Sequence, residues 1–171
     1  IDFINGSINK YYKEIADFEG LSVEYLTSFD IKNLTDEEIK DKLKDYFNKY
    51  YNKELNYGMT MYGPHRDDFY FNFNGNDLKY FGSQGQQKLA VLCLKLSEIG
   101  LFKEVSGFNP VILLDDIFSE LDIKKRNRLL KFVGDNDIQS IITTTDLKSI
   151  NKKYLNESYI YEVKNGNIER K

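Results

Sequence analysis

The stretch VILLDDIFSELD, residues 111–122, places four apolar side chains directly before two adjacent carboxylates, Asp115 and Asp116. A short apolar run of this kind is typical of a central strand in a parallel sheet. Ligands of open α/β sheets bind beyond the carboxyl ends of the strands, where both carboxylates would lie. Because neighbouring negative charges repel each other unless a cation or a proton offsets them, the stretch predicts a strand that ends in a cation site.

Magnesium fits this pair, since it takes one or two carboxylates together with phosphate oxygens and water. In this interpretation Asp115 belongs to the metal shell and Asp116 is a base that orients water. An apolar run followed by Asp is the Walker B pattern, which many unrelated strands also match. The alternative is that Asp116 only caps the helix that follows.

The segments around this strand predict an α/β fold. Residues 86–105 are apolar on nearly every side, which is typical of a buried helix. KKRNRLLKFVGDN, residues 124–136, is an amphipathic helix pattern, and QSIITTT, residues 139–145, indicates a second buried strand. A turn at residues 165–166 predicts a closing hairpin. Because strands and helices alternate, we expect a partly parallel sheet with flanking helices.

The first 57 residues carry mainly helical patterns. Residues 4–19 predict one helix, and residues 21–29 predict a strand or an extended link. A second helix begins at Thr35, which with Glu38 has the spacing of a capping box. The apolar side chains of this second helix recur at helical spacing, and we expect them to form a packing face: Leu43, Tyr46, Phe47, Tyr50 and Tyr51.

A change of pattern follows at Gly58, where Gly, Pro and two-residue alternation appear. Phe69, Phe71 and Phe73 would point to one side of a strand. The turn sequence NGND, residues 74–77, then leads into LKYF, residues 78–81, which predicts a β-hairpin.

Composition limits the protein classes further. No apolar run approaches the roughly 20 residues needed to span a bilayer, and no signal peptide opens the chain. Cys93 is the single cysteine, so no internal disulfide is possible, which fits a cytoplasmic location. The net charge of −3 does not by itself indicate nucleic-acid binding. The first residue is Ile1 rather than Met, and we expect the chain to be a piece of a longer one.

Two polar segments support a phosphate site. GSQGQQK, residues 82–88, starts the buried helix, where free N–H groups and the positive end of the helix dipole attract anions. Ser83 adds a hydroxyl, and Gly85 lets a phosphate approach the backbone closely. TTTD, residues 143–146, offers further hydroxyls at the same sheet edge. The alternative for Ser83 is an ordinary helix cap, which is compatible with phosphate binding.

The order of these segments resembles the C-terminal lobe of an ABC-type ATPase head. Within that class the chain resembles the RecF family of bacterial recombinational repair, which belongs with the Rad50 and SMC-like heads. Three segments carry the resemblance: YGPHRDDF (62–69), FGSQGQQKLAVLCLKLSEI (81–99) and PVILLDDIFSELDIKKRNRLL (110–130). It implies that residues 58–171 form the C-terminal lobe of the head, and that residues 1–57 are a mostly helical piece of a second, arm domain.

The resemblance also implies roles for individual residues. It implies a signature motif that touches the γ-phosphate of ATP on the opposite subunit, formed by Ser83, Gln84, Gly85 and Gln86. Asp115 would hold Mg²⁺ through water, and Asp116 would polarise the attacking water. The D-loop at the dimer interface would contain Ser119 and Asp122.

Two departures from ABC proteins matter. Thr145 stands where transporter-type proteins usually carry a γ-phosphate-sensing His, although a hydroxyl can still donate a hydrogen bond. The phosphate-binding pattern GxxxxGK[ST], Walker A, is absent from the sequence. In the family it lies in the N-terminal half. We therefore expect the complete protein to be a weak ATPase and this chain alone to be inactive.

Charged residues outside these motifs have two interpretations each. Four cations follow the D-loop: Lys124, Lys125, Arg128 and Lys131. They would either contact a DNA backbone or form a solvated surface, and we favour the solvated surface. His65 is the single histidine and, like Arg66, lies in the family motif. For His65 a hydrogen-bonded turn and a place near nucleotide or DNA remain equally open. Arg66 would pair with Asp67 or Asp68 or contact phosphate, and because adjacent residues seldom face each other we favour a more distant partner.

As partners, the resemblance implies ATP, Mg²⁺, gapped or junction DNA, the proteins RecR and RecO, and an ATP-dependent homodimer, in repair, replication and the SOS response. One alternative is an ATPase head of another system, such as a transporter or another SMC-like protein. Another is a DNA- or protein-binding module whose acidic pair has no catalytic role.

Overall fold

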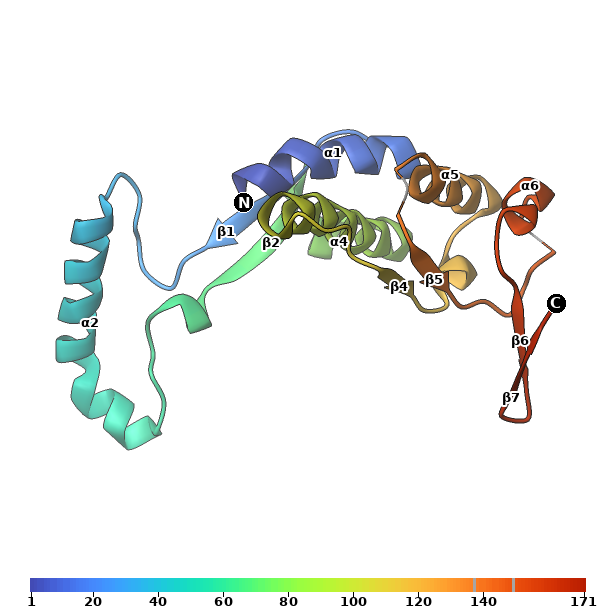
Figure 1. Cartoon of the computed structure of the whole chain (residues 1–171). Coiled ribbons are helices and arrows are strands. Elements are labelled where there is room, and N and C mark those ends of the chain that lie inside the picture. Colours follow the sequence, from blue (N-terminus) through green and yellow to red (C-terminus); the bar gives the residue numbers. More distant parts are fainter. Residues whose placement is uncertain (137, 149) are drawn as a thin grey trace.

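The computed structural model describes residues 1–136, 138–148 and 150–171. They form an arch in which α2 stands apart at one end and the β6–β7 hairpin projects at the other (Figure 1). The helices are α1 (Asp2–Ala16), α2 (Asp36–Tyr57), α3 (Leu78–Phe81), α4 (Gln84–Ser106), α5 (Ile123–Asp135) and α6 (Lys152–Asn156), with 3₁₀ turns η1 (Pro64–Arg66) and η2 (Ile117–Glu120). The strands are β1 (Leu21–Leu26), β2 (Asp68–Phe73), β3 (Asn76–Asp77), β4 (Ile112–Leu114), β5 (Ser140–Ile142), β6 (Tyr161–Lys164) and β7 (Asn167–Arg170).

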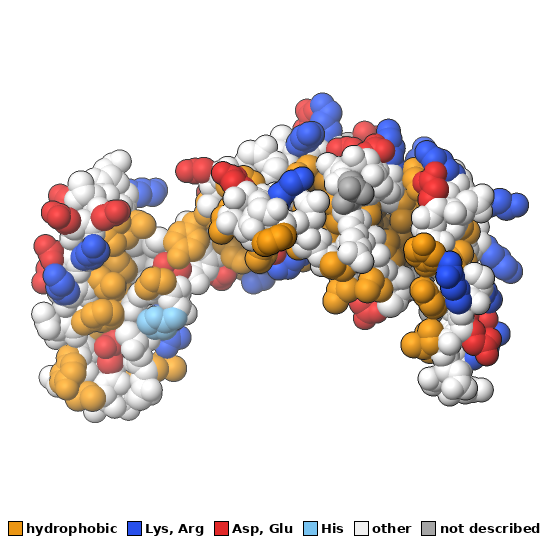
Figure 2. All heavy atoms as spheres, viewed as in Figure 1, with side chains coloured by type: hydrophobic (Ala, Val, Ile, Leu, Met, Phe, Trp, Pro, Cys, Tyr) orange, Lys and Arg blue, Asp and Glu red, His pale blue; other side chains and the backbone are white. Residues whose placement is uncertain are grey.

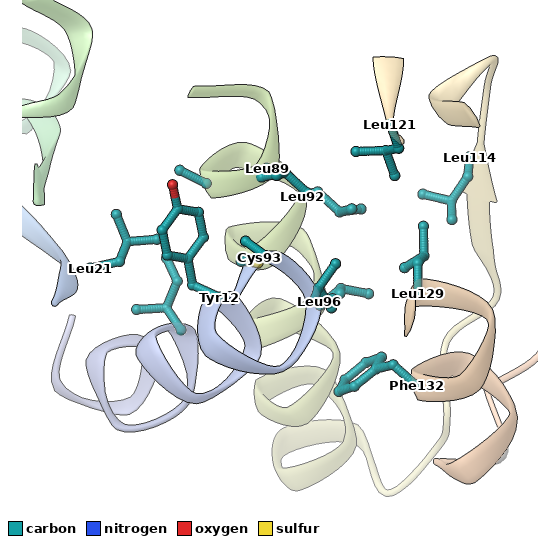
Figure 3. Close-up of a cluster of buried hydrophobic side chains, with 14 of the residues drawn as sticks. Tyr12, Leu21, Leu89, Leu92, Cys93, Leu96, Leu114, Leu121, Leu129 and Phe132 are labelled. Atoms are coloured by element: carbon teal, nitrogen blue, oxygen red, sulfur yellow. The ribbon is translucent and has the colours of Figure 1, made fainter. Parts of the chain in front are cut away.

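The core lies where α1, α4 and α5 meet (Figure 3). Tyr12 of α1 and Cys93 of α4 are fully buried, and Phe132 of α5 packs edge-on against Tyr11. Burial in apolar surroundings raises the pKa of the Cys93 thiol to about 12, as expected for an inert structural cysteine. Deletion of a large side chain here would leave a cavity, so this core holds the lobe together.

An antiparallel sheet continues the core toward α2. β1 pairs with β2 from Leu21 opposite Phe73 to Leu26 opposite Asp68, and β3 adds two residues beyond an Asn74–Gly75 turn. The hairpin prediction is confirmed, but LKYF is the helical turn α3 rather than a strand. Asp77 caps this turn by accepting the Lys79 N–H, and Leu78 is buried, so local capping and burial outweigh the strand pattern.

The predicted capping box of α2 is confirmed. Thr35 accepts the Glu38 N–H, and the Glu38 carboxylate accepts the Thr35 N–H. No residue of α2 is buried, so the apolar side chains of α2 form only a partial packing face. Tyr46 and Tyr50 pack against Tyr62, whereas Tyr51 remains 60% exposed.

β4 and β5 form a parallel pair, with Ile112 opposite Ser140 and Leu114 opposite Ile142. This pair confirms the α/β class and the partly parallel sheet. Leu114 is buried against the core, but Leu113 is 72% exposed and Ile141 is 58% exposed. A parallel strand buried on both faces normally has helices or further strands on each side, so one face of this pair is uncovered in the described residues.

α1 and α2, which both lie within residues 1–57, pack differently. α1 and β1 share the core with α4, and among residues 1–57 only α2 and its connecting segments project from it (Figure 1). The physical reason is that one face of α1 supplies fully buried side chains, including Ile8 and Ile15, whereas α2 supplies none. Among the described residues, no helix is long and apolar enough to cross a membrane.

Candidate functional site

The two carboxylates of the opening stretch lie at the end of β4. Asp115 follows the last strand residue, and Asp116 begins the 3₁₀ turn η2. Both residues are exposed, and neither forms an ion pair with any of the described residues. Asp116 has a left-handed backbone, with φ of 46° and ψ of 25°, which Asp tolerates better than most residues.

Thr143, directly after β5, connects both acidic residues. Its hydroxyl accepts the Asp116 N–H at 2.9 Å and donates to Asp115 Oδ1 at 2.5 Å. The Thr143 N–H continues the sheet by donating to the Leu114 carbonyl. The parallel pairing of β4 with β5 therefore sets the orientation of the acidic pair, and it leaves the second carboxylate oxygen of Asp115 outside these bonds.

The alternative role for Asp116, as a helix cap, has no support in the geometry. Its side chain makes no capping hydrogen bond at the start of η2. Instead its carbonyl accepts the hydroxyl of Ser119 at 2.9 Å and the Ser119 N–H at 3.2 Å. Ser119 therefore closes the turn behind Asp116 and leaves the carboxylate of Asp116 exposed.

At the start of α4, Ser83 is an exposed N-cap. Its hydroxyl accepts the Gln86 N–H at 3.3 Å, and the Gln86 side chain accepts the Ser83 N–H at 2.9 Å. Gln84 begins the helix and is also exposed. A Cβ built on Gly85 would meet no atom within 4 Å. Glycine destabilises a helix relative to Ala, and nothing within the chain requires it here, so Gly85 leaves open surface beside the cap.

Gln87 was not among the predicted site residues, yet it fixes this helix start. Its side-chain amide lies 3.1–3.2 Å from the carbonyls of Leu78, Lys79 and Gly82. Gly82 packs so closely on Leu78 that a Cβ there would lie 2.6 Å from a Leu78 methyl carbon. The glutamines of residues 82–88 were the signal in the sequence that could have pointed to Gln87. The sequence does not distinguish a side-chain amide that binds the backbone from one that binds a ligand.

Asp122 caps α5 by accepting the Lys125 N–H at 3.0 Å, and it forms an ion pair with the Lys125 ammonium at 2.7 Å. The hydrogen bond from the Lys125 side chain is the largest effect that lowers the pKa of Asp122. Arg128 pairs with Asp17, at the C-terminal end of α1, at 3.1 Å. Two of the four predicted DNA-contacting cations are therefore paired, while Lys124 and Lys131 are exposed.

His65 and Arg66 lie at the base of the segment that carries α2. The His65 ring lies 3.3 Å from the Thr60 carbonyl, which Arg66 Nε also contacts at 2.8 Å. Arg66 does not pair with either neighbouring aspartate; its second contact is the sulfur of Met59, at 2.9 Å. Both side chains therefore stabilise the segment that follows α2, through contacts with Met59 and Thr60.

The predicted nucleotide residues fall into two groups. Asp115, Asp116 and Ser119 are joined around Thr143 and η2, whereas Ser83, Gln84, Gly85 and Gln86 form the separate start of α4. Thr145 is exposed, and it is Thr143 that contacts the acidic pair. The described residues contain no cluster of three or more potential metal ligands. A metal at Asp115 would thus take most of its ligands from phosphate and water, as Mg²⁺ does in nucleotide sites.

A groove of about 620 Å³ runs between α4 and β4. Its lining is mainly apolar and includes Val91, Leu92, Ile99, Phe102, Val111 and Leu113. Hydrophobic side chains also gather on α2 and on the β6–β7 hairpin in the view of Figure 2. Among the described residues, α4 is buried on the side that faces α1 and α5 and is open along the groove, which corrects the expectation of a helix buried all round.

The fold defines the class: the chain has the fold of an SMC-like ATPase head. A solved SMC ATPase, studied for ATP-driven dimerization and DNA-stimulated activation, matches 99% of this chain and 82% of its own, with a TM-score of 0.52 and 13% identity. At that identity the likeness shows the fold alone. No family model matches the chain.

The curated relatives that match this chain are RecF proteins. The DNA replication and repair protein RecF of Crocosphaera subtropica is 38% identical over 98% of this chain and 44% of its own length. RecF of Clostridium kluyveri is 40% identical over 85% of this chain and 37% of its own length. The recombination mediator RecF solved with ATP has a TM-score of 0.74 over 99% of this chain and 43% of that one. The chain is therefore homologous to RecF and spans about two fifths of the length of these relatives.

Proposed function

We propose that this chain supplies one half of the ATP site of a RecF-type protein that binds DNA in recombinational repair and replication. The observation that carries the proposal is the exposed carboxylate pair at the end of a parallel strand, without an ion pair among the described residues, in a chain of which 99% matches a RecF structure. The chain contributes acids on one face and a capped helix start on another, and the complete protein contributes Walker A.

In this proposal Asp115 binds Mg²⁺ through water, and Asp116 orients the water that attacks the γ-phosphate. The start of α4, from Ser83 to Gln86, meets the γ-phosphate of ATP held by a second subunit, so that ATP drives dimerisation. Ser119 and Asp122 lie at that dimer interface. The open surface beside Gly85 supports a close approach of phosphate to the backbone.

DNA at gaps or junctions, and the proteins RecR and RecO, are the proposed partners. The exposed cations Lys124 and Lys131 give a small positive surface on α5, whereas α2 is acidic in its first turn. We therefore assign any DNA contact of this chain to α5 rather than to α2. The apolar groove beside β4 is the surface that the remainder of the head covers, since an ATPase sheet requires further strands.

The test uses the full-length protein that carries this chain, with ATP turnover, ATP-dependent dimerisation and binding to gapped DNA as readouts. Asp116→Asn is expected to lower turnover at least a hundredfold while dimerisation with ATP persists. Asp135→Asn, which changes an acid at the far end of α5, is the matched control. Turnover by the 171-residue chain alone, or full turnover by the Asp116 variant, contradicts the proposal. Dimerisation without gapped-DNA binding favours a head of another system.

A further inference from the structure

We infer that Thr143 is a positioning residue for the acidic pair, with its hydroxyl acting as a clamp between β4 and β5. The inference rests on the proposed function, because it concerns the same metal and nucleotide site. The sequence pointed to the hydroxyls of residues 143–146 as a group, and it gave an individual role to Thr145 but none to Thr143.

The geometry uses the hydroxyl in both directions. A threonine hydroxyl has one proton to donate and two lone pairs with which to accept. Here the proton goes to Asp115 Oδ1, at 2.5 Å, and a lone pair receives the Asp116 N–H, at 2.9 Å. A single atom therefore orients the side chain of one acid and the backbone of the next.

Each bond has a distinct consequence. The bond to Asp115 fixes one carboxylate oxygen, so that the other oxygen also has a defined direction. The bond from the Asp116 N–H supports a left-handed backbone, φ 46°, that would otherwise be less favourable. Metal sites depend on such supporting hydrogen bonds, whose removal typically weakens metal binding 10–100-fold.

Thr143 contributes little to the core by comparison. Its side chain is exposed, and its backbone N–H bond to the Leu114 carbonyl does not depend on the side chain. Thr143→Val keeps the size and the β-branched shape and removes only the hydroxyl, so the strand pairing is retained. Thr143→Ser keeps the hydroxyl and serves as the rescue. Thr144→Val is the matched control, because the bonds of the Thr144 hydroxyl to other described residues are with Asp146 in its own turn.

The experiment uses the full-length protein and two readouts. Hydrogen exchange followed by mass spectrometry on the peptide that contains Asp116 should be about tenfold faster in Thr143→Val than in the other variants. Affinity for Mn²⁺ in the presence of a non-hydrolysable ATP analogue, measured by electron paramagnetic resonance, should fall about tenfold or more in Thr143→Val and recover in Thr143→Ser.

The outcomes separate the two hypotheses. Unchanged exchange at Asp116 in Thr143→Val overturns the inference that the Thr143 hydroxyl acts as a clamp. Faster exchange with unchanged Mn²⁺ affinity overturns the positioning role and leaves the proposed function standing. A wild-type protein that binds no Mn²⁺ with the analogue overturns the proposed function, and with it the positioning role.

Discussion

The Tyr25 hydroxyl donates a hydrogen bond to Asp67 Oδ2 at 2.6 Å and joins the end of β1 to the segment that returns from α2. The other carboxylate oxygen of Asp67 accepts the Ser28 N–H at 2.7 Å. One carboxylate therefore holds together the two segments that connect α2 to the core; α2 and these two segments are called the arm below. Partial burial opposes ionisation of Asp67, but the bonds from Tyr25 and Ser28 outweigh it and lower its pKa.

Asp67→Asn is expected to loosen the base of the arm. An amide keeps one acceptor oxygen in place of two, so one of the two bonds is lost or weakened. Backbone exchange in residues 26–30 should become several-fold faster. Asp68→Asn is the control, because among the described residues the Asp68 carboxylate bonds only to the adjacent Phe69 N–H. Equal exchange in the two variants would show that Asp67 does not hold the arm.

The same bonds predict a pH dependence. The pKa of Asp67 is lower in the folded chain than in the unfolded one, so its contribution to stability is present above the unfolded pKa of about 4. This contribution is lost as the pH falls through the lower, folded pKa. The protection of residues 26–30, measured as exchange relative to the intrinsic rate at each pH, should therefore fall below about pH 4 in the wild type, and the Asp67→Asn protein should lack this step. A step of the same size in both proteins would assign it to other carboxylates.

Ser83 allows its structural and ligand roles to be separated. Ser83→Ala removes the cap of α4 and should cost about 1 kcal/mol in the free energy of unfolding, measured with urea. Ser83→Asp keeps a capping acceptor, so stability should be nearly unchanged, but its charge would repel a γ-phosphate. In the full-length protein Ser83→Asp should therefore abolish ATP-dependent dimerisation.

The contrary result would be informative. If Ser83→Asp dimerises with ATP as the wild type does, the start of α4 is not at the phosphate. If Ser83→Ala alone fails to dimerise, the loss follows from the cap.

The uncovered face of β4 predicts self-association of the 171-residue chain. Leu113 is 72% exposed beside the groove, and large apolar surfaces drive association. Leu113→Lys should lower the association constant at least tenfold in analytical ultracentrifugation. Val163→Lys, on β6, is a matched control of similar exposure. A larger effect from the Val163 change would show that the surface responsible for association lies on the β6–β7 hairpin.

The core predicts a large and local stability loss. Leu96 of α4 is 2% exposed within the α1–α4–α5 core, so Leu96→Ala should cost about 2–5 kcal/mol in the free energy of unfolding. Leu55→Ala, at a position of α2 that is 63% exposed, should change it by less than about 0.5 kcal/mol. Similar losses in urea titrations would mean that α2 is packed as tightly as α4.

The sequence by itself determined the local features, because the residues that produce them are close along the chain. The capping boxes at Thr35 and Ser83, the α4 helix, the β4 strand and both hairpin turns depend on spacings of a few residues. The likeness to RecF also follows from contiguous motifs. LKYF was wrong as a strand because a capped turn that buries Leu78 also satisfies its pattern.

Only the tertiary structure decided which distant residues meet. α1 joins the core of α4, Asp17 meets Arg128, and Thr143 contacts Asp115. Each of these contacts depends on the register and packing of elements far apart in sequence. The parallel pairing of β4 with β5 brings Thr143 to Asp115, since a shift of one residue would turn that hydroxyl to the other face of the sheet.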